Sequence, residues 1–156
     1  MRRTHARCNG HVTLAPLWVA YTENIGTLAR TADAVGACLA LARGADARAA
    51  LRRGNTLPRS VCVHWVRDRE VWLRRQRAQH ARILAVELAE GATRLGDLAA
   101  ATVPTVVLLG HEHHGVAEDV WQLVDEVVEI PMIGTGSSLN VAVAGSLVAY
   151  RLAGML

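Results

Sequence analysis

Short apolar runs alternate along the chain with longer segments whose apolar residues recur at helical spacing. The middle runs are nearly continuous in apolar residues, as in parallel strands that are buried on both faces. Six strands are predicted: His11–Pro16, Cys38–Ala42, Val61–Val66, Arg82–Leu88, Pro104–Leu109 and Glu126–Ile130. The alternation predicts an α/β fold with a mostly parallel sheet flanked by helices.

The first helix is predicted to begin near Asn24 and to end at Gly36. Asparagine is a good N-cap, and glycine readily takes the left-handed conformation that ends helices. Between them, one face of the helix is apolar, with Ile25, Leu28, Ala29, Ala32 and Val35. Arg30 falls off this face, so it is free to point toward a neighbouring site or toward solvent.

The last helix is predicted over residues 138–154 and is apolar in nearly every direction. Its apolar residues are Leu139, Val141, Val143, Ala144, Leu147, Val148 and Leu152. A helix that is apolar all round is buried on several sides. In a chain of 156 residues, we expect it to pack partly on a second copy of the chain.

No linker or repeat divides the sequence, so we predict an N-terminal tail (residues 1–10) and a single domain (residues 11–156). The net charge is +3, but residues 1–94 hold 16 arginines and 7 acidic residues, whereas residues 95–156 hold 1 arginine and 7 acidic residues. An arginine-rich surface suits a phosphate backbone, because arginine donates bidentate hydrogen bonds and displaces condensed counterions. An ordinary solvated face is the alternative.

A cytoplasmic location is expected from the ends and the cysteines of the chain. The first residues lack a hydrophobic run, and the most apolar stretch, residues 139–156, is interrupted by polar side chains. Neither a signal peptide nor a membrane span is therefore predicted. The three cysteines, Cys8, Cys38 and Cys62, are widely spaced without a CxxC pair, which predicts reduced thiols.

Three segments that follow apolar runs combine glycine with polar side chains. They are residues 22–26, residues 110–115 and residues 134–140. In open α/β sheets, ligands bind outside the carboxyl ends of the strands. Together the three segments predict a binding site at one edge of the sheet.

Other classes of site fit these segments poorly. A zincin-type metal site needs a second histidine at the fifth position from His111, where Gly115 stands, so we expect no metal. His113 and His114 are interpreted as exposed loop residues. A dinucleotide loop would need glycine in place of Leu139. Neither Ser137 nor Ser138 stands in the GxSxG elbow of a hydrolase.

Taken together, the three segments resemble the motifs of the SpoU/TrmH family, in the SPOUT class of RNA methyltransferases. The first motif runs from Asn24 to Arg30, the second is Gly110-His111-Glu112-His113-His114-Gly115, and the third runs from Ile130-Pro131-Met132 to Ser138-Leu139-Asn140-Val141. They occur in the family's order across residues 11–154, and the third is the most specific.

The resemblance implies an α/β domain with a C-terminal trefoil knot, a homodimer, and S-adenosylmethionine as methyl donor. In that family, the adenosyl group lies against backbone groups of the second and third motifs, which here are Gly110, Ile130 and Met132. Ser138 and Leu139 would complete this pocket, and Leu88 would close one side.

The reaction implied is transfer of the methyl group to a ribose 2′-hydroxyl of RNA. Arg30 matches the family's catalytic arginine, and because guanidinium is effectively never deprotonated, we expect it to stabilise the developing alkoxide and grip a phosphate. Asn24, Glu112, Ser138 and Asn140 would hold this arginine and the ribose, and Arg30 would reach the site either within its own chain or across the dimer interface. As alternatives, Asn24 would cap the first helix, and Ser138 or Asn140 the last.

Larger relatives carry an additional RNA-binding module, so here we expect RNA to bind the body of the dimer. The expected surface comprises Arg30, Arg43, Arg48, Arg52, Arg53 and Arg59, with Arg74, Arg75 and Arg77 as a second one. Compact relatives often modify transfer RNA, which we favour over ribosomal RNA.

Two other functions are compatible with the same fold. One is a non-catalytic RNA-binding or cofactor-binding homologue, which the intact Asn24, Arg30, Glu112, Ser138 and Asn140 argue against. The other is a methyltransferase that acts on a base nitrogen, which nucleoside analysis would distinguish.

Overall fold

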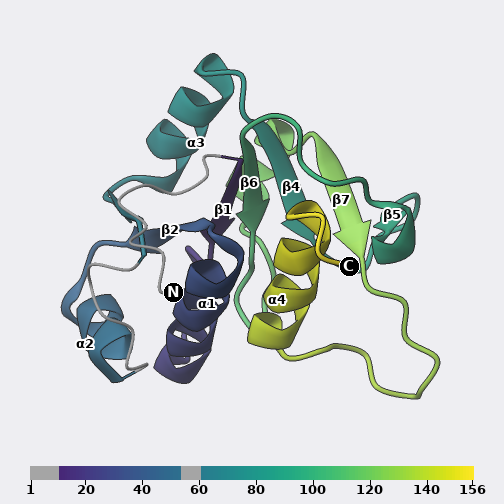
Figure 1. Cartoon of the computed structure of the whole chain (residues 1–156), viewed down its shortest axis with the longest axis horizontal. Helices are drawn as coiled ribbons and strands as arrows, with labels where there is room; N and C mark the ends of the chain where they lie inside the picture. The colour runs from purple at the N-terminus through teal and green to yellow at the C-terminus, as the bar shows by residue number, and fades with distance from the viewer. Residues whose placement is uncertain (1–10, 54–60) are drawn as a thin grey trace, which may run out of the picture.

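The computed structural model describes residues 11–53 and 61–156. It contains a seven-stranded sheet, whose central strands are labelled in Figure 1. The strands lie in the order β3-β2-β1-β6-β4-β7-β5, and every pairing is parallel. The predicted α/β fold is confirmed. The predicted tail, residues 1–10, lies outside the described residues, and the trefoil knot stays a prediction. The strands are β1 (Val12–Ala15), β2 (Cys38–Ala42), β3 (Val63–Val66), β4 (Arg82–Val86), β5 (Thr93–Arg94), β6 (Thr105–Leu108) and β7 (Glu126–Glu129).

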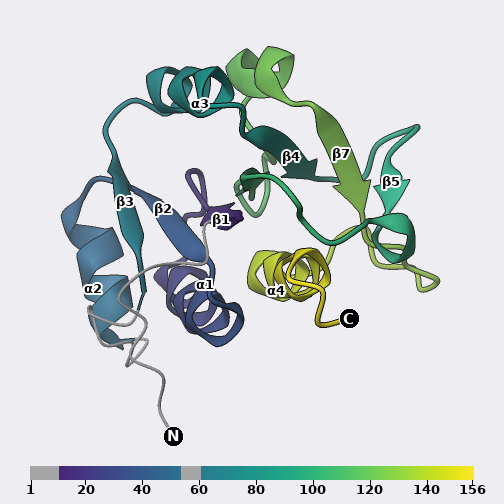
Figure 2. The same ribbon diagram turned by 45° about the horizontal axis from the view of Figure 1, so that its top comes forward.

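Helices cover both faces of the sheet (Figure 2). One face carries α1 (Thr22–Val35), α2 (Ala45–Arg53) and α4 (Val141–Leu152), and the other carries α3 (Arg69–Ala78) and the 3-10 helix Glu118–Leu123. Neighbouring residues on a strand point to opposite faces. Val107 therefore packs into the first layer with Leu28 and Val148, whereas Val106 packs into the second with Leu73 and Val120.

The chain changes direction across the sheet between β1 and β6. From β1 it runs outward to β2 and then to the edge strand β3, after which it crosses to the other side and forms β4, β6 and β7. A crevice forms outside the carboxyl ends of the strands at such a switch point, and ligands of open α/β sheets bind there. The topology therefore places the candidate site beside the ends of β1 and β6.

The first helix begins at Thr22, with Tyr21 at the N-cap position and no side-chain cap hydrogen bond. The interpretation of Asn24 as the N-cap is wrong, because Asn24 lies inside the first turn, where its buried side chain bonds to another loop. The predicted end of the helix is confirmed. Gly36 has a φ of 74° and its backbone N–H donates to the carbonyl of Ala32.

The last helix begins at Val141, three residues later than predicted, and Asn140 is its N-cap. The Oδ1 atom of Asn140 accepts hydrogen bonds from the backbone N–H groups of Ala142 (2.9 Å) and Val143 (3.2 Å). The alternative role of Asn140 as a helix cap is confirmed, whereas Ser138 lies before the helix and does not cap it.

Close packing between α4 and its neighbours depends on Gly145. A Cβ atom at this position would lie 2.7 Å from the side chain of Leu109 and 2.8 Å from that of Leu28. The hydroxyl groups of Thr31 and Ser146 lie 2.7 Å apart across the same α1–α4 contact. These contacts fix α4, and hence Asn140 at its start, relative to α1. None of the described helices has the length and apolarity that crossing a membrane requires.

Candidate functional site

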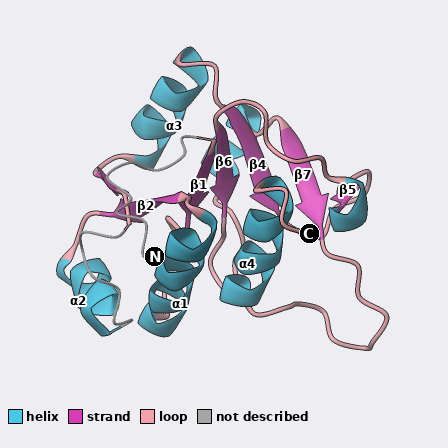
Figure 3. Ribbon diagram, viewed as in Figure 1, coloured by secondary structure: helices cyan, strands magenta, loops and turns pink. Residues whose placement is uncertain are grey.

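Four loops meet at the carboxyl edge of the central strands. They follow β1, β4, β6 and β7, and the loop between β7 and α4 extends away from the body of the molecule (Figure 3). Two adjoining cavities, of about 210 Å³ and 520 Å³, open among these loops. The larger cavity lies within the range of about 300–1,000 Å³ that is typical of ligand sites, and both cavities lie near the strand switch point, where ligands of open α/β sheets bind.

Most of the residues that the sequence predicts to hold the cofactor line the smaller cavity. Five of the six predicted residues line it: Leu88, Ile130, Met132, Ser138 and Leu139. The sixth, Gly110, lines the larger cavity. Leu88 lies beyond the end of β4 and is 54% exposed, so it belongs to a loop and not to the strand predicted there.

The larger cavity collects four of the five predicted catalytic residues, Asn24, Glu112, Ser138 and Asn140. It shares lining residues with the smaller cavity, namely Val86, Glu87, Ser138, Leu139 and Ala144. Molecules bound in the two cavities would therefore meet beside Ser138 and Leu139.

Glu112 holds the turn that leads into α1. Its Oε2 accepts a hydrogen bond from the backbone N–H of Ala20 (3.0 Å), and its Oε1 accepts from the N–H of Tyr21 (3.1 Å) and the Nδ2 of Asn24 (2.8 Å). Desolvation by burial raises the pKa of Glu112, but these hydrogen bonds outweigh it and the pKa lies below its ordinary value. Glu112 is therefore held as a carboxylate.

Asn24 connects this carboxylate to the last helix. Its Oδ1 accepts a hydrogen bond of 3.1 Å from the Nδ2 of Asn140, whose own Oδ1 caps α4. Asn24 is only 8% exposed, and both ends of its amide have partners. Asn24 thus connects Glu112 with Asn140, and these bonds join the first turn of α1, the loop after β6 and the start of α4.

Ser138 differs from these three residues. Its side chain is exposed, lines both cavities, and makes no hydrogen bond with any part of the chain that the structure describes. The hydroxyl group is therefore available to a bound molecule at the boundary of the cavities.

Arg30 does not join the other predicted catalytic residues. It follows Asn24 by six residues on α1, which corresponds to about 240° of rotation and about 9 Å of rise. Its exposed side chain lines a separate cavity of about 300 Å³ between α1 and α2, where Arg53 also lies. Within a single chain Asn24 and its neighbours therefore do not hold Arg30, and contact across a dimer interface, the alternative expected from the sequence, stays a prediction.

Glu87 was not predicted from the sequence. Its Oε1 accepts a hydrogen bond of 3.0 Å from the backbone N–H of Val116. Gly115 lies against it with a φ of 70°, and a Cβ atom there would lie 2.5 Å from the Glu87 Oε1. The loop itself is closed by reciprocal backbone hydrogen bonds of 2.9 Å between His111 and Gly115. In the sequence, Glu87 could have been noticed as an acidic residue that directly follows an apolar run, at the end of a predicted strand.

It was also not predicted from the sequence that one tyrosine and two histidine side chains would line the larger cavity together. Tyr21, His111 and His113 line this cavity. From the sequence, His113 and His114 were interpreted only as exposed loop residues, and both are exposed.

Among residues 11–53 and 61–156, one group of cysteine and histidine side chains has its sulfur and nitrogen atoms within 4.8 Å of one another, and it lies on β2 and around β3, not in the histidine-rich loop. It comprises Cys38, Cys62 and His64. Cys62 is a free thiol, whose pKa is raised by burial, and burial lowers the pKa of His64. Cys38 is engaged in a disulfide, so the prediction of reduced thiols is wrong there.

The first predicted RNA surface is exposed on and beside α2. Arg43, Arg48, Arg52 and Arg53 all have exposed side chains, and Arg59 lies outside the described residues. The guanidinium group of Arg48 lies over the ring of Trp65, 5.5 Å from its centroid. Trp65 is 39% exposed on the edge strand β3. Arginine and an exposed aromatic ring are thus combined at this edge.

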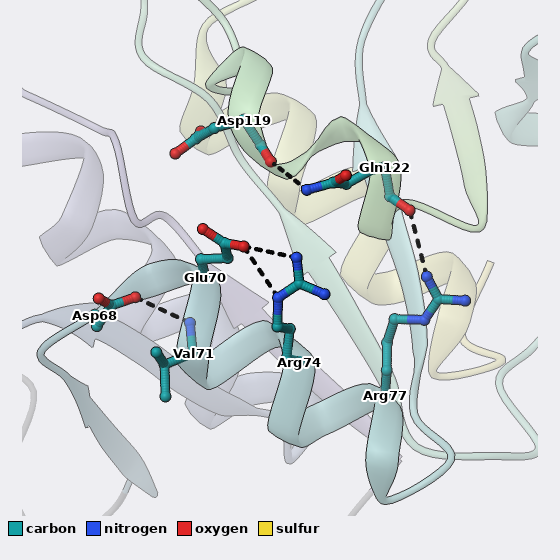
Figure 4. A network of polar contacts seen from close by, with 7 residues as sticks. All are labelled: Asp68, Glu70, Val71, Arg74, Arg77, Asp119 and Gln122. Atoms are coloured by element: carbon teal, nitrogen blue, oxygen red, sulfur yellow. Dashed lines mark hydrogen bonds and ion pairs between the residues drawn. The ribbon is translucent and has the colours of Figure 1, made fainter.

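Two arginines of the second predicted surface have partners within the chain (Figure 4). Arg74 donates to the Oε1 of Glu70 at 2.7 Å and 3.0 Å, and Arg77 donates to the carbonyl of Gln122 at 3.4 Å. Near α2, Arg53 also has a partner, since it donates to the Thr22 hydroxyl at 3.1 Å, whereas the guanidinium groups of Arg43 and Arg52 have no partner among the described residues. Arg75 has no such partner in the described part of the chain.

The chain matches the family described as SpoU rRNA Methylase over residues 13–150. A tRNA (guanosine(18)-2'-O)-methyltransferase from Escherichia coli (strain K12) is 33% identical over 151 residues, which cover 94% of this chain and 64% of the relative. The protein of the same name from Thermus thermophilus is 44% identical over 50 residues, or 32% of this chain and 26% of the relative. The chain thus spans less than two thirds of either relative.

Solved structures share the fold. An AdoMet-bound rRNA methyltransferase from Sinorhizobium meliloti superposes with a TM-score of 0.79 at 25% identity, covering 94% of this chain and 57% of that one. A structure described as giving insights into the 2-OH methylation of C/U34 on tRNA superposes with a TM-score of 0.73 at 28% identity, covering 93% and 94%. The match spans nearly the full length of the second structure.

Proposed function

Because the chain belongs to the SpoU rRNA Methylase family, we propose that it transfers a methyl group from S-adenosylmethionine to a ribose 2′-hydroxyl of RNA. The observation that supports this most is the pair of cavities that adjoin at Ser138 and Leu139. A reaction between two bound molecules needs two neighbouring pockets, and alignment of the reactants supplies much of the rate.

The smaller cavity fits S-adenosylmethionine by the chemistry of its lining. Leu88, Ile130, Met132 and Leu139 offer apolar surface to an adenine ring, and the Glu87 carboxylate offers negative charge to a cation. When bound, the cofactor supplies an electrophilic methyl group on a positively charged sulfur. The related Sinorhizobium meliloti structure is described as AdoMet-bound.

The residues of the larger cavity would position the ribose. Ser138 presents a free hydroxyl at the boundary, where it would hydrogen-bond the sugar. Asn24, Glu112 and Asn140 would keep the surrounding loops rigid, since their hydrogen bonds join three segments. Because arginine cannot act as a base, the hydroxyl proton would leave to a neighbouring phosphate or to water.

Arg30 would complete the site of a second copy of the chain. Its side chain is exposed and turned away from Asn24 on α1. The apolar α4 leaves Val143 46% exposed, beside Leu139 at 40%, and a second copy would cover these side chains. In the homodimer, the guanidinium group would stabilise the developing alkoxide and hold a phosphate.

We favour transfer RNA as substrate. The Escherichia coli and Thermus thermophilus relatives are named for transfer RNA, as is the structure matched over nearly its full length, although the Sinorhizobium meliloti protein is named for ribosomal RNA. Arg43, Arg48, Arg52 and Arg53 would hold the phosphate backbone. A protein that modifies transfer RNA is expected in the cytoplasm.

Transfer of tritiated methyl from S-adenosylmethionine tests this function, with bulk transfer RNA and ribosomal RNA as separate acceptors. We expect incorporation into transfer RNA, and a Ser138→Ala variant should incorporate about tenfold less because it loses a hydrogen bond to the ribose. The Thr135→Ala control, on the same loop but outside both cavities, should match the wild type. Cofactor binding without incorporation into either RNA would indicate a non-catalytic homologue.

A further inference from the structure

Tyr21 and His113 form a corner at the opening of the larger cavity. The Tyr21 hydroxyl lies 3.3 Å from the His113 Nε2, and the ring centroids are 6.2 Å apart with an angle of 86° between the planes. Both residues line the cavity that holds Asn24 and Asn140. The two nearly perpendicular rings are therefore two walls of one corner, beside the predicted ribose site.

The backbone of Tyr21 is held in place, whereas its side chain is half exposed. The backbone N–H of Tyr21 donates to the Glu112 Oε1 at 3.1 Å, so the network that holds Asn24 also places this residue. The side chain nevertheless remains 52% exposed. A large ring held in place without being buried in the core is suited to contact a bound molecule.

We infer that Tyr21 and His113 receive the nucleobase of the nucleotide whose ribose is methylated. This rests on the proposed function, which places the ribose beside Ser138 in the same cavity. The base is attached to the sugar carbon next to the one that bears the 2′-hydroxyl. It must therefore lie within a few ångströms of the methylated oxygen, at the wall of this cavity.

The shape of the corner determines the class of nucleotide that it takes. A base stacked on the face of one ring presents its edge to the other, because the rings are nearly perpendicular. Only a base that has left its own stack can enter such a corner, as in loops and bulges of RNA. The substrate is thus an unpaired, splayed-out nucleotide, and stacking accepts it with little regard to which base it carries.

Four variants test the inference. Tyr21→Ala removes the ring but keeps the backbone N–H that Glu112 binds, and Tyr21→Phe keeps the ring. Loss of one base stack costs about 1–3 kcal/mol, so the KM for RNA should rise about 5- to 150-fold in Tyr21→Ala and stay within about threefold in Tyr21→Phe. His113→Ala should weaken RNA binding in the same direction. His11→Ala is the control for loss of an exposed histidine, since His11 lies outside the cavity and makes no ring contact within the described part of the chain.

The Kd for S-adenosylmethionine and the thermal midpoint are measured on the same variants. The inference predicts that both stay at wild-type values in Tyr21→Ala, while single-stranded RNA binds more weakly than to the wild type. An unchanged KM and Kd for RNA in Tyr21→Ala would overturn it, as would an equal loss of cofactor and RNA binding, which indicates a structural role. Wild-type protein that transfers no methyl group refutes the proposed function instead, and the RNA-binding comparison then still decides about Tyr21.

Discussion

The Glu112 Oε1 accepts a hydrogen bond of 2.8 Å from the Nδ2 of Asn24, although 88 residues separate the two in sequence. Glu112 also accepts from the backbone of Ala20 and Tyr21. The second motif thereby holds the start of α1 against the loop after β6. In this arrangement Glu112 positions the loops that form the site.

Replacement of Glu112 by glutamine should weaken this arrangement in a pH-dependent way. The folded pKa of Glu112 is lowered, so its contribution to stability is complete above the ordinary value of about 4.3 and is lost as the pH falls through the lower folded pKa. The thermal midpoint of Glu112→Gln should lie below that of the wild type at pH 7, and the difference should shrink as the pH falls below about 4.

Glu118→Gln is the matched control, because Glu118 is exposed and has no partner among the described residues. Its thermal midpoint should follow that of the wild type at every pH. Wild-type and Glu112→Gln curves that run parallel down to about pH 3 would contradict a role for the carboxylate.

If the proposed homodimer forms, Arg30 should act on the site of the other copy of the chain. Arg30→Lys and Arg30→Ala should each lose most methyl transfer, because lysine cannot make the bidentate contact, while cofactor binding stays unchanged. Co-expression of Arg30→Ala with Ser138→Ala should restore roughly a quarter of wild-type activity, because half of the randomly formed dimers contain one site with every group intact. Activity of the mixture at about a twentieth of wild type, which is the residual activity of the Ser138→Ala chains alone, would show that Arg30 serves its own chain.

Gly115 should not tolerate a side chain. Its φ of 70° disfavours other residues, and a Cβ atom would press on Glu87. Gly115→Ala should lower the affinity for S-adenosylmethionine by about tenfold and lower the thermal midpoint by several degrees. Gly136→Ala, with nothing within 4 Å of its Cβ position, should leave both unchanged when measured by calorimetry.

The surface near α2 should bind RNA through its charge. Arg52→Ala should make the dependence of RNA affinity on log salt less steep by about 0.7–0.9, the value for one lost phosphate contact. Arg74→Ala, whose guanidinium group is already paired with Glu70, is the control and should keep the wild-type slope. Equal slopes for all three proteins would place the RNA elsewhere.

The sequence predicted the strands well where burial produces a continuous apolar run. Residues 38–42 are such a run and form β2 with the predicted bounds. The strand β5 was missed because Thr93 and Arg94 carry no apolar pattern. The order of the strands could not be predicted either, since periodicity indicates which face is buried but not which strand lies alongside.

The spacing of the three motifs identified most of the residues that line the two cavities. It did not predict which of these residues would form hydrogen bonds with one another. Asn140 was expected either to cap a helix or to hold the ribose, and its cap role leaves the Nδ2 free to bind Asn24. The Glu112 contacts join loops that are distant in sequence, which local patterns cannot reveal. The separation of Arg30 from Asn24 was not predicted, although helix geometry offered a signal, since six residues correspond to about 240° of rotation.

The most direct test of the proposed function is mass spectrometry of nucleosides from transfer RNA treated with the protein and isotopically labelled S-adenosylmethionine. We predict one labelled nucleoside with the methyl group on the ribose 2′-oxygen, present with wild-type protein and absent with Arg30→Ala. A label on a base nitrogen, or no labelled nucleoside in transfer or ribosomal RNA despite cofactor binding, would contradict the proposed function.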